Sequence, residues 1–345
     1  MRMTNLAALA AAAFFTPSAA AQAQAAAPLF ASDQPIHISI SAPISTLLRN
    51  RALGTTVSGT LVDPAGQSLP VSLSIRSTTR RNADVCDFPP LRVSFAGRAA
   101  PTSLFAGQNR LKLVTHCGNG AGAQQYELLE YSAYRMLNQL TPRSFRVRLA
   151  NIDYRDSSGR PIVTRYGFFI EPLKDLARRN GTRPLQTQAM IPIQDLSPAD
   201  SARYALFQHM IANHDWSMRA PSVGKDCCHN AEMLGTLTPG GAIPVPYDFD
   251  YSGMVGAPYA VPPEQMRLSS VKQRFFRGYC VHSPQILAAA QQFRAQRPQM
   301  LGVLAQTPGL EPRTVQRATS FLNGFFNDIA TDQDVSTKVL KRCAS

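Results

Sequence analysis

Short runs in which apolar and polar residues alternate fill the first part of the chain. Residues 56–75 contain two such runs on either side of the turn sequence DPAG at 63–66. Alternation with a period of two is typical of strands that bury one face, and Pro and Gly favour a tight connection. We therefore expect a hairpin over 56–75 and further strands at 36–43, 91–96 and 110–117.

A glycine-rich break at 117–124 separates these strands from a segment with helical spacing, residues 126–140. The apolar positions of this segment recur every three or four residues and share one helical face, which is formed by Leu129, Ala133, Leu137 and Leu140. Two more strands are expected at 144–156 and 164–172, around a Ser-Ser-Gly turn. Residues 35–173 are thus predicted to be rich in strands, with one main helix.

The second half of the chain is predicted to be mostly helical. The sequence SPAD at 197–200 is typical of a helix start, because serine caps the first turn, proline fits there, and a carboxylate favours the positive end of the helix dipole. The runs at 231–237 and 242–250 are expected to pair as a hairpin around Pro-Gly-Gly. From residue 283 onwards, apolar residues again follow a helical spacing.

The N-terminal residues are typical of a secretory signal peptide. Arg2 precedes the apolar run 6–15, and small residues over 19–23 offer a cleavage site. An uncleaved membrane anchor is the alternative, but the run is shorter than the roughly 20 residues that a span needs. We expect residues 1–23 to be a signal peptide, 24–34 a disordered leader, and the protein to be exported to the periplasm or beyond, with no later transmembrane segment.

Six cysteines in an exported chain favour disulfide bonds over thiol chemistry, because oxidising compartments preserve such bonds. We expect Cys86 to pair with Cys117. The remaining pairs are expected among the cysteines of the second half, which are Cys227, Cys228, Cys280 and Cys343.

The formal net charge of +13 comes mainly from arginines that are spread along the chain. Such a charge attracts polyanions in general, including nucleotides, anionic lipids and nucleic acids, without choosing among them. No nucleic-acid-binding motif is present, so no specific nucleic-acid partner is predicted.

A set of polar residues follows the order in which phosphoryl-transfer enzymes place their functional groups. Such chemistry needs a lysine for the phosphates, a helix carboxylate to hold the lysine, an acid near the acceptor hydroxyl, and oxygen ligands for Mg²⁺. Candidates for these roles occur in this order along the chain: Lys112, Glu127 and Glu130, Asp215, Asn230, and Asp248.

Each of these residues alone has an ordinary structural explanation. Lys112 could be solvated at a sheet edge, and Asp215 or Asn230 could simply form turns. The pair Asp248 and Asp250 is harder to explain in this way, because the run before it is apolar and its end should be partly buried. Buried carboxylates are usually paired or metal-bound.

Several of these segments resemble the CotH spore-coat kinase family and, more distantly, the atypical kinase-like fold of aminoglycoside phosphotransferases. The resemblance covers about residues 100–280 and is carried by "LKLVTHC", "YELLEYSAYRMLNQL", "YGFFIEPLKDLARRNG", "NHDWS", "HNAEML" and "PVPYDFDYSG". It implies an α+β, two-lobed atypical kinase-like fold. Residues 35–100 would be an N-terminal β segment, 101–175 a β-rich N-lobe with one main helix, and 176–345 a mostly helical C-lobe.

The resemblance also implies roles for individual residues. Lys112 would hold the phosphates of ATP or another nucleotide, Glu127 or Glu130 would orient Lys112, and Asp215 would be the catalytic acid position. Glu171 would join Lys112 in binding the nucleotide, and Mg²⁺ or Mn²⁺ would be held by Asn230, Asp248 and Asp250, with His229 as a substitute for Asn230.

The function expected from this resemblance is that of an exported atypical kinase with an unknown protein or small-molecule acceptor. The alternative is a catalytically inactive kinase-like protein of the envelope or the secreted fraction, which would bind a ligand without transferring a group.

Other chemistries have less support in the sequence. A metal hydrolase could use histidines and carboxylates together, but no HExxH-like motif is present; its candidate ligands are His214, Asp215, His229, Asp248 and Asp250. A zinc site could use Cys227, Cys228 and His229. A serine or cysteine nucleophile is not predicted, because no GxSxG sequence or comparable signature occurs.

Overall fold

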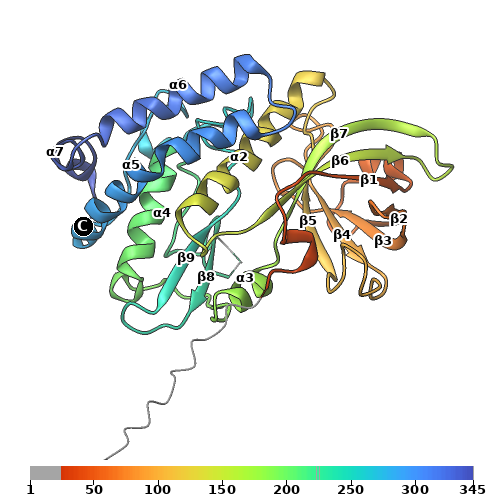
Figure 1. Ribbon diagram of the computed structural model, residues 1–345, viewed down its shortest axis with the longest axis horizontal. Coiled ribbons are helices and arrows are strands. Elements are labelled where there is room, and N and C mark those ends of the chain that lie inside the picture. Colours follow the sequence, from red (N-terminus) through yellow and green to blue (C-terminus); the bar gives the residue numbers. More distant parts are fainter. Residues whose placement is uncertain (1–24, 223, 225, 345) are drawn as a thin grey trace, which may run out of the picture.

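Seven strands form a closed barrel in the N-terminal half of the computed structural model, which describes residues 25–222, 224 and 226–344 (Figure 1). The strand order around the barrel is β1-β2-β3-β4-β5-β7-β6. The strands are β1 (Ile36–Ser41), β2 (Thr56–Val62), β3 (Ser68–Ile75), β4 (Leu91–Phe95), β5 (Arg110–Val114), β6 (Val147–Arg155) and β7 (Pro161–Ile170). The expected signal peptide, residues 1–23, lies outside the described residues.

The barrel closes because its first strand pairs in parallel with β6. Ile36 of β1 lies opposite Ala150, and Ser41 lies opposite Arg155, while all other neighbouring strands run antiparallel. Residues that alternate along each strand fill the interior, which removes their apolar surface from water. The most deeply buried of them include Ile40, Leu61, Leu73, Val93, Leu113 and Phe169.

This closed barrel overturns the expected fold. The prediction of a two-lobed kinase-like fold is wrong, because strands from the expected N-terminal segment 35–100 and from the expected N-lobe 101–175 form one continuous sheet. The alternating pattern revealed which residues face inwards. It did not reveal that β1 and β6 pair, because periodicity identifies a buried face and not the neighbouring strand.

The C-terminal half is built from helices around a small hairpin. Figure 1 shows α4, α5 and α6 on the side away from the barrel, with α2 between the barrel and α5. The α-helices of the described residues, in both halves of the chain, are α1 (Ile44–Arg49), α2 (Gln124–Leu140), α3 (Leu173–Arg179), α4 (Pro198–Met210), α5 (Ser283–Gln306), α6 (Pro312–Asp328) and α7 (Asp332–Asp334). The hairpin consists of β8 (Ala231–Gly235) and β9 (Ala242–Pro246).

Short helical turns complete the structure. The 3₁₀ turns span Pro28–Phe30, Ala121–Ala123, Ile193–Asp195, Glu264–Met266, Cys280–His282 and Leu340–Arg342, and Val335–Val339 form a π-helical turn. Pro28–Phe30 belong to the segment 24–34 that we expected to be disordered. Leu29 and Phe30 are instead buried against the barrel, and this burial explains why the turn is ordered.

Helix α2 is the main packing element between the two halves of the chain. The predicted stripe Leu129, Ala133, Leu137 and Leu140 is buried, as are residues on its other faces. Tyr134 packs against Phe168 of β7 and Phe249 after β9. The helix therefore links the barrel to the hairpin and carries Glu127 and Glu130 into the interior.

The six cysteines form three disulfide bonds, Cys86–Cys117, Cys227–Cys228 and Cys280–Cys343. The predicted Cys86–Cys117 pair is confirmed, and the other four pair within the second half as expected. Such bonds are typical of proteins from oxidising compartments and fit an exported protein. Within the described ranges, no helix has the length and apolar character needed to cross a membrane.

Candidate functional site

A polar pocket of about 790 Å³ lies where the β3–β4 connection, β5 and the hairpin meet. The barrel side contributes Arg76, Arg80 and Lys112, and the segment after α4 contributes Asp215 and residues 226–232, together with Ser222. The end of β9 completes the pocket with Tyr247, Asp248, Asp250 and Tyr251. The pocket therefore brings together most of the charged residues that the sequence had singled out.

The predicted site residues divide into two groups. The pocket is lined by Lys112, Asp215, Asn230, Asp248 and Asp250. The described residues that line it do not include Glu127, Glu130 or Glu171.

Arg80 is a deeply buried cation that lines the pocket. Its side chain is only 4% exposed, and its Nε lies 3.2 Å from Oδ2 of Asp250. Its two terminal nitrogens lie 3.3 Å from Oδ1 of Asp248 and 3.7 Å from Oε2 of Glu130. Burial alone would lower the pKa of Arg80, but Asp250 and the other nearby acids raise it well above its usual range. Arg80 therefore stays charged and balances the carboxylates around it.

Burial dominates the acid–base behaviour of these carboxylates. It raises the pKa of Asp250 to about 6, although Arg80 opposes this shift. Burial also raises the pKa of Glu130 well above its usual range. Tyr259 donates a hydrogen bond of 3.1 Å to Oδ2 of Asp250, whereas Oε1 of Glu130 has no hydrogen-bond partner among the described residues.

Lys112 does not form the predicted ion pair with Glu127 or Glu130. Its Nζ lies 3.6 Å from Oε1 of Glu232 and 4.4 Å from the centre of the Tyr247 ring. The reason is the strand geometry: Lys112 points away from the barrel interior that its buried neighbours Leu111 and Leu113 fill. Burial and Arg76 lower the pKa of Lys112. Glu130 of α2, one of the two carboxylates expected to orient Lys112, contacts Arg80 instead.

Glu127 has a structural position behind the pocket. Its side chain is buried, and Oε1 accepts a hydrogen bond of 2.9 Å from the backbone N–H of Cys117. Burial raises the pKa of Glu127 to about 7. Glu127 thus fixes the chain at the Cys86–Cys117 disulfide and does not orient Lys112.

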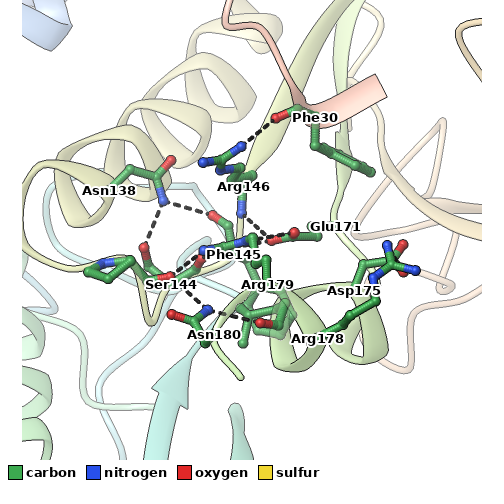
Figure 2. Close-up of polar contacts among 12 residues, drawn as sticks. Phe30, Asn138, Ser144, Phe145, Arg146, Glu171, Asp175, Arg178, Arg179 and Asn180 are labelled. Atoms are coloured by element: carbon green, nitrogen blue, oxygen red, sulfur yellow. Dashed lines mark hydrogen bonds and ion pairs between the residues drawn. The ribbon is translucent and has the colours of Figure 1, made fainter. Parts of the chain in front are cut away.

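Glu171 lies in a different buried cluster, between the end of β7 and α3 (Figure 2). Its two oxygens accept hydrogen bonds of 2.8 and 2.9 Å from the guanidinium of Arg179, and one of them also accepts the backbone N–H of Arg146 at 3.0 Å. The Glu171 side chain has no exposed surface. Its acceptor oxygens join two segments of the fold, and Glu171 does not line the pocket, so its role in nucleotide binding stays a prediction that this position does not support.

Asp215 is held by two neighbours on the pocket wall. Its Oδ1 lies 2.6 Å from Nε2 of His229, and its Oδ2 accepts a hydrogen bond of 3.0 Å from Nδ2 of Asn230. On the other side of the imidazole, Nδ1 of His229 lies 2.6 Å from Oγ of Ser222. A serine nucleophile was not predicted from the sequence, because no GxSxG or comparable signature occurs. Ser222, His229 and Asp215 are far enough apart in the chain that they meet only in the folded protein.

Asn230 and Asp248 have unusual backbone conformations. Their φ angles are 49° and 62°, in the left-handed region that residues other than glycine seldom adopt. The two residues are neighbours at the end of the hairpin, where the N–H of Tyr247 donates to the carbonyl of Asn230 at 3.2 Å. Such conformations cost free energy and concentrate at functional sites. Here they turn both side chains towards the pocket.

The side chains fit a divalent cation only in part. Among the described residues, no group of three or more His, Cys, Asp or Glu side chains could hold a metal ion. Mg²⁺, however, is often bound by one or two protein oxygens together with substrate phosphates and water. Asp248, whose side chain is 28% exposed, and the amide oxygen of Asn230 fit that limited role. Asp250 fits it less well, because Arg80 and Tyr259 bind the same oxygen.

The two alternative metal sites do not agree with the geometry. Cys227 and Cys228 are bonded to each other, so they cannot supply thiolates to zinc. Nε2 of His214 lies 2.8 Å from the carbonyl of Gln273, and His214 does not line the pocket. The predicted hydrolase set is thus not assembled.

No protein-family model matches the chain, and no curated protein matches it. The resemblance to the CotH family therefore stays a prediction, and the function must be argued from the pocket itself.

Several residues of the pocket were not predicted from the sequence. Arg76 and Arg80 lie in the basic segment "RSTTRR" at 76–81, which carries no spacing that separates the buried Arg80 from its neighbour Arg81. The only feature of the sequence that could have indicated a functional role was the position of this segment between two predicted strands. Ser222 and Tyr247 were likewise not predicted as functional residues.

Proposed function

We propose that the pocket binds the phosphate groups of a nucleotide, or of a similar phosphorylated small molecule, and that the protein transfers a phosphoryl group from this ligand. The observation that carries the proposal is the arrangement of charges across one pocket. Arg76 and Lys112 lie on the barrel side, and Asp215 and Asp248 lie on the side of the hairpin. The proposal rests on this pocket and not on a kinase-like fold.

The two cations are suited to an anionic ligand. Arg76 is half-buried, and no ion pair with it occurs in the part of the chain that the structure describes. Its guanidinium can therefore offer paired N–H donors to phosphate oxygens. Lys112 is one-third exposed, and its ion pair with Glu232 is long, at 3.6 Å, so a phosphate can replace it while the contact with the Tyr247 ring remains.

A divalent cation would be held by Asp248 and Asn230 together with the phosphates. When bound, Mg²⁺ or Mn²⁺ would neutralise charge on the phosphate oxygens. The protein's own contribution is to orient the phosphates with Arg76 and Lys112 and to hold Asp215 in a fixed position beside them. The hydrogen bonds from His229 and Asn230 supply that fixed position.

Ligand binding without transfer is the second candidate. It is favoured by Arg80, whose ion pairs with Asp248 and Asp250 reduce the negative charge available for a metal. In this case the protein would be an exported protein that binds phosphorylated compounds.

Nucleotide titrations followed by thermal unfolding test the proposal. ATP with MgCl₂ or MnCl₂ should raise the melting temperature of the wild type. Lys112→Met should weaken the apparent affinity about tenfold or more, because a charge-assisted hydrogen bond is lost. Asp248→Asn should abolish the part of the stabilisation that depends on the metal. The matched control is Lys174→Met, an exposed lysine on α3 outside the pocket, and it should bind like the wild type.

The outcomes separate the candidates. The absence of stabilisation by ATP, ADP and pyrophosphate in the wild type would rule out a nucleotide ligand, and the absence of stabilisation by p-nitrophenyl phosphate as well would rule out both candidates. Stabilisation without transfer of the γ-phosphoryl group to the protein, to water or to an added acceptor would favour binding alone.

A further inference from the structure

Three side chains on one wall of the pocket form a continuous hydrogen-bonded chain. Oγ of Ser222 lies 2.6 Å from Nδ1 of His229, and Nε2 of the same ring lies 2.6 Å from Oδ1 of Asp215. Each of the three lines the pocket and is partly exposed to it. A hydroxyl, an imidazole and a carboxylate in this order are the parts of an activated serine nucleophile.

The carboxylate determines which imidazole nitrogen carries the proton. Asp215 accepts at 2.6 Å from Nε2, so the neutral ring is held with its proton on Nε2 and its lone pair on Nδ1. That lone pair faces Oγ of Ser222 and can take the hydroxyl proton. Asn230 donates to the second oxygen of Asp215 and keeps the carboxylate in this orientation.

The backbone holds the serine and the histidine at this distance. The N–H of His229 donates to the carbonyl of Ala220 at 3.1 Å, and the N–H of Ser217 donates to the carbonyl of His229 at 2.9 Å. Ser222 lies two residues beyond Ala220, so these bonds bring its segment back to the histidine. The contact between Ser222 and His229 is therefore supported by backbone hydrogen bonds close to both residues.

The rest of the pocket indicates the class of substrate. Serine nucleophiles attack both acyl and phosphoryl groups, but Arg76 and Lys112 place two cations in the same pocket. These cations match the negative charge that a phosphate carries before the reaction begins, whereas a neutral ester carries none, so the pocket favours a phosphate.

We propose that Ser222 is the nucleophile that accepts the phosphoryl group of a phosphate monoester or nucleoside triphosphate, with His229 as its general base. Asp215 is a positioning residue that acts through His229. The inference rests on the proposed function and deepens it, because it names the first acceptor of the phosphoryl group.

The reaction is a displacement at phosphorus. A bond forms between Oγ of Ser222 and phosphorus, and the bond from phosphorus to the leaving oxygen breaks. The leaving alcohol or nucleoside diphosphate takes the electron pair of that bond. The proton of the serine hydroxyl moves to Nδ1 of His229, which can return it to the leaving group.

Two kinds of probe test the nucleophile and the substrate class separately. An alkyl fluorophosphonate reports an activated serine without needing the ligand, and its labelled peptide is identified by mass spectrometry. ATP with MgCl₂, and p-nitrophenyl phosphate, report phosphoryl transfer to Ser222. Both labels should appear on Ser222 in the wild type and be absent in Ser222→Ala. The control Ser158→Ala changes an exposed serine of the β6–β7 turn and should be labelled like the wild type.

Variants of the other two residues test their roles. His229→Gln should slow fluorophosphonate labelling by about 100-fold, the usual contribution of a general base. Asp215→Asn should lower the maximal labelling rate while the probe concentration at half-maximal rate stays unchanged, and Asp215→Glu should restore part of the rate. A residue with only a structural role would not lower the maximal labelling rate while leaving the probe concentration at half-maximal rate unchanged.

Several results would overturn the inference. One is the absence of fluorophosphonate from Ser222 in the folded wild type. Another is acetylation of Ser222 by p-nitrophenyl acetate without phosphorylation by either phosphate probe, since this would assign the serine to acyl transfer. If ATP binds and its phosphoryl group reaches an acceptor equally well in Ser222→Ala, the inference fails while the proposed function stands. If Ser222 is phosphorylated by p-nitrophenyl phosphate but no nucleotide binds, the serine assignment stands and the nucleotide is excluded.

Discussion

The Nε atom of Arg80 lies 3.2 Å from Oδ2 of Asp250, and both side chains are almost completely buried. The same guanidinium contacts Asp248 and Glu130, so one arginine from the β3–β4 connection balances acids from α2 and from the segment after β9. The barrel and the helical half are therefore joined by charge as well as by apolar packing.

Replacing this arginine should destabilise the fold. Arg80→Met should lower the free energy of unfolding by about 3–5 kcal/mol at pH 7, because it leaves buried carboxylates without their cation. Urea unfolding measures the loss. The matched control is Arg160→Met, since Arg160 is 84% exposed and pairs with Asp156 on the surface. That variant should lose less than about 1 kcal/mol. Equal losses in the two variants would contradict the assigned role of Arg80.

Glu127 should make stability depend on pH. Burial raises its pKa from 4.5 to about 7, so between these values the folded protein binds more protons than the unfolded chain. Its contribution to stability is therefore greatest below pH 4.5 and declines as the pH rises to 7. Glu127→Gln removes this decline, and relative to the wild type it should gain about 3 kcal/mol between pH 4 and pH 8. Urea unfolding across this range is the measurement, and parallel curves for the two proteins would refute the prediction.

Glu171 should affect stability without affecting ligand binding. Glu171→Gln leaves the buried guanidinium of Arg179 without its counter-charge and should cost about 3 kcal/mol. Since Glu171 lies outside the pocket, the affinity for ATP measured by calorimetry below the melting temperature should stay within about twofold. A weakened affinity with normal stability would restore Glu171 as a ligand-binding residue.

Glu232, unlike Glu171, should affect ligand binding without affecting stability. It is 30% exposed and pairs with Lys112 in the pocket, so Glu232→Gln should change stability by less than about 1 kcal/mol. It also removes the competitor of a phosphate for Lys112, and the affinity for ATP should rise about two- to fivefold. Calorimetric titration of the wild type and the variant decides this point. A weaker affinity in Glu232→Gln would show that the carboxylate itself contacts the ligand.

The sequence predicted the local elements better than their assembly. The stripe of Leu129 and Leu137 marked α2, and alternation marked the strands, because burial of one face imposes a period on the chain. The pairing of β1 with β6 joins residues more than one hundred positions apart, such as Ile36 and Ala150. No local pattern encodes that choice, and the expected fold failed there.

In the pocket too, residues marked by their local sequence could be predicted, whereas residues whose role depends on distant parts of the chain could not. Asp248 could be identified because an apolar strand leads directly to it, and Lys112 because it interrupts an apolar strand. Arg80 could not be identified, because its burial depends on acids that are contributed by α2 and by the segment after β9. Ser222 gained its significance only from the distance to His229 in the folded chain.

The disulfide Cys86–Cys117 ties the β3–β4 connection, which carries Arg80, to the chain that leads into α2. A cross-link of this kind restricts how far the connection can move away from the helix that carries Glu130. The bond therefore bears on the arrangement of the pocket as well as on the stability of the fold. Reduction of this bond would remove the restraint on Arg80, so the reduced protein is expected to bind the proposed phosphate ligand less tightly than the oxidised protein.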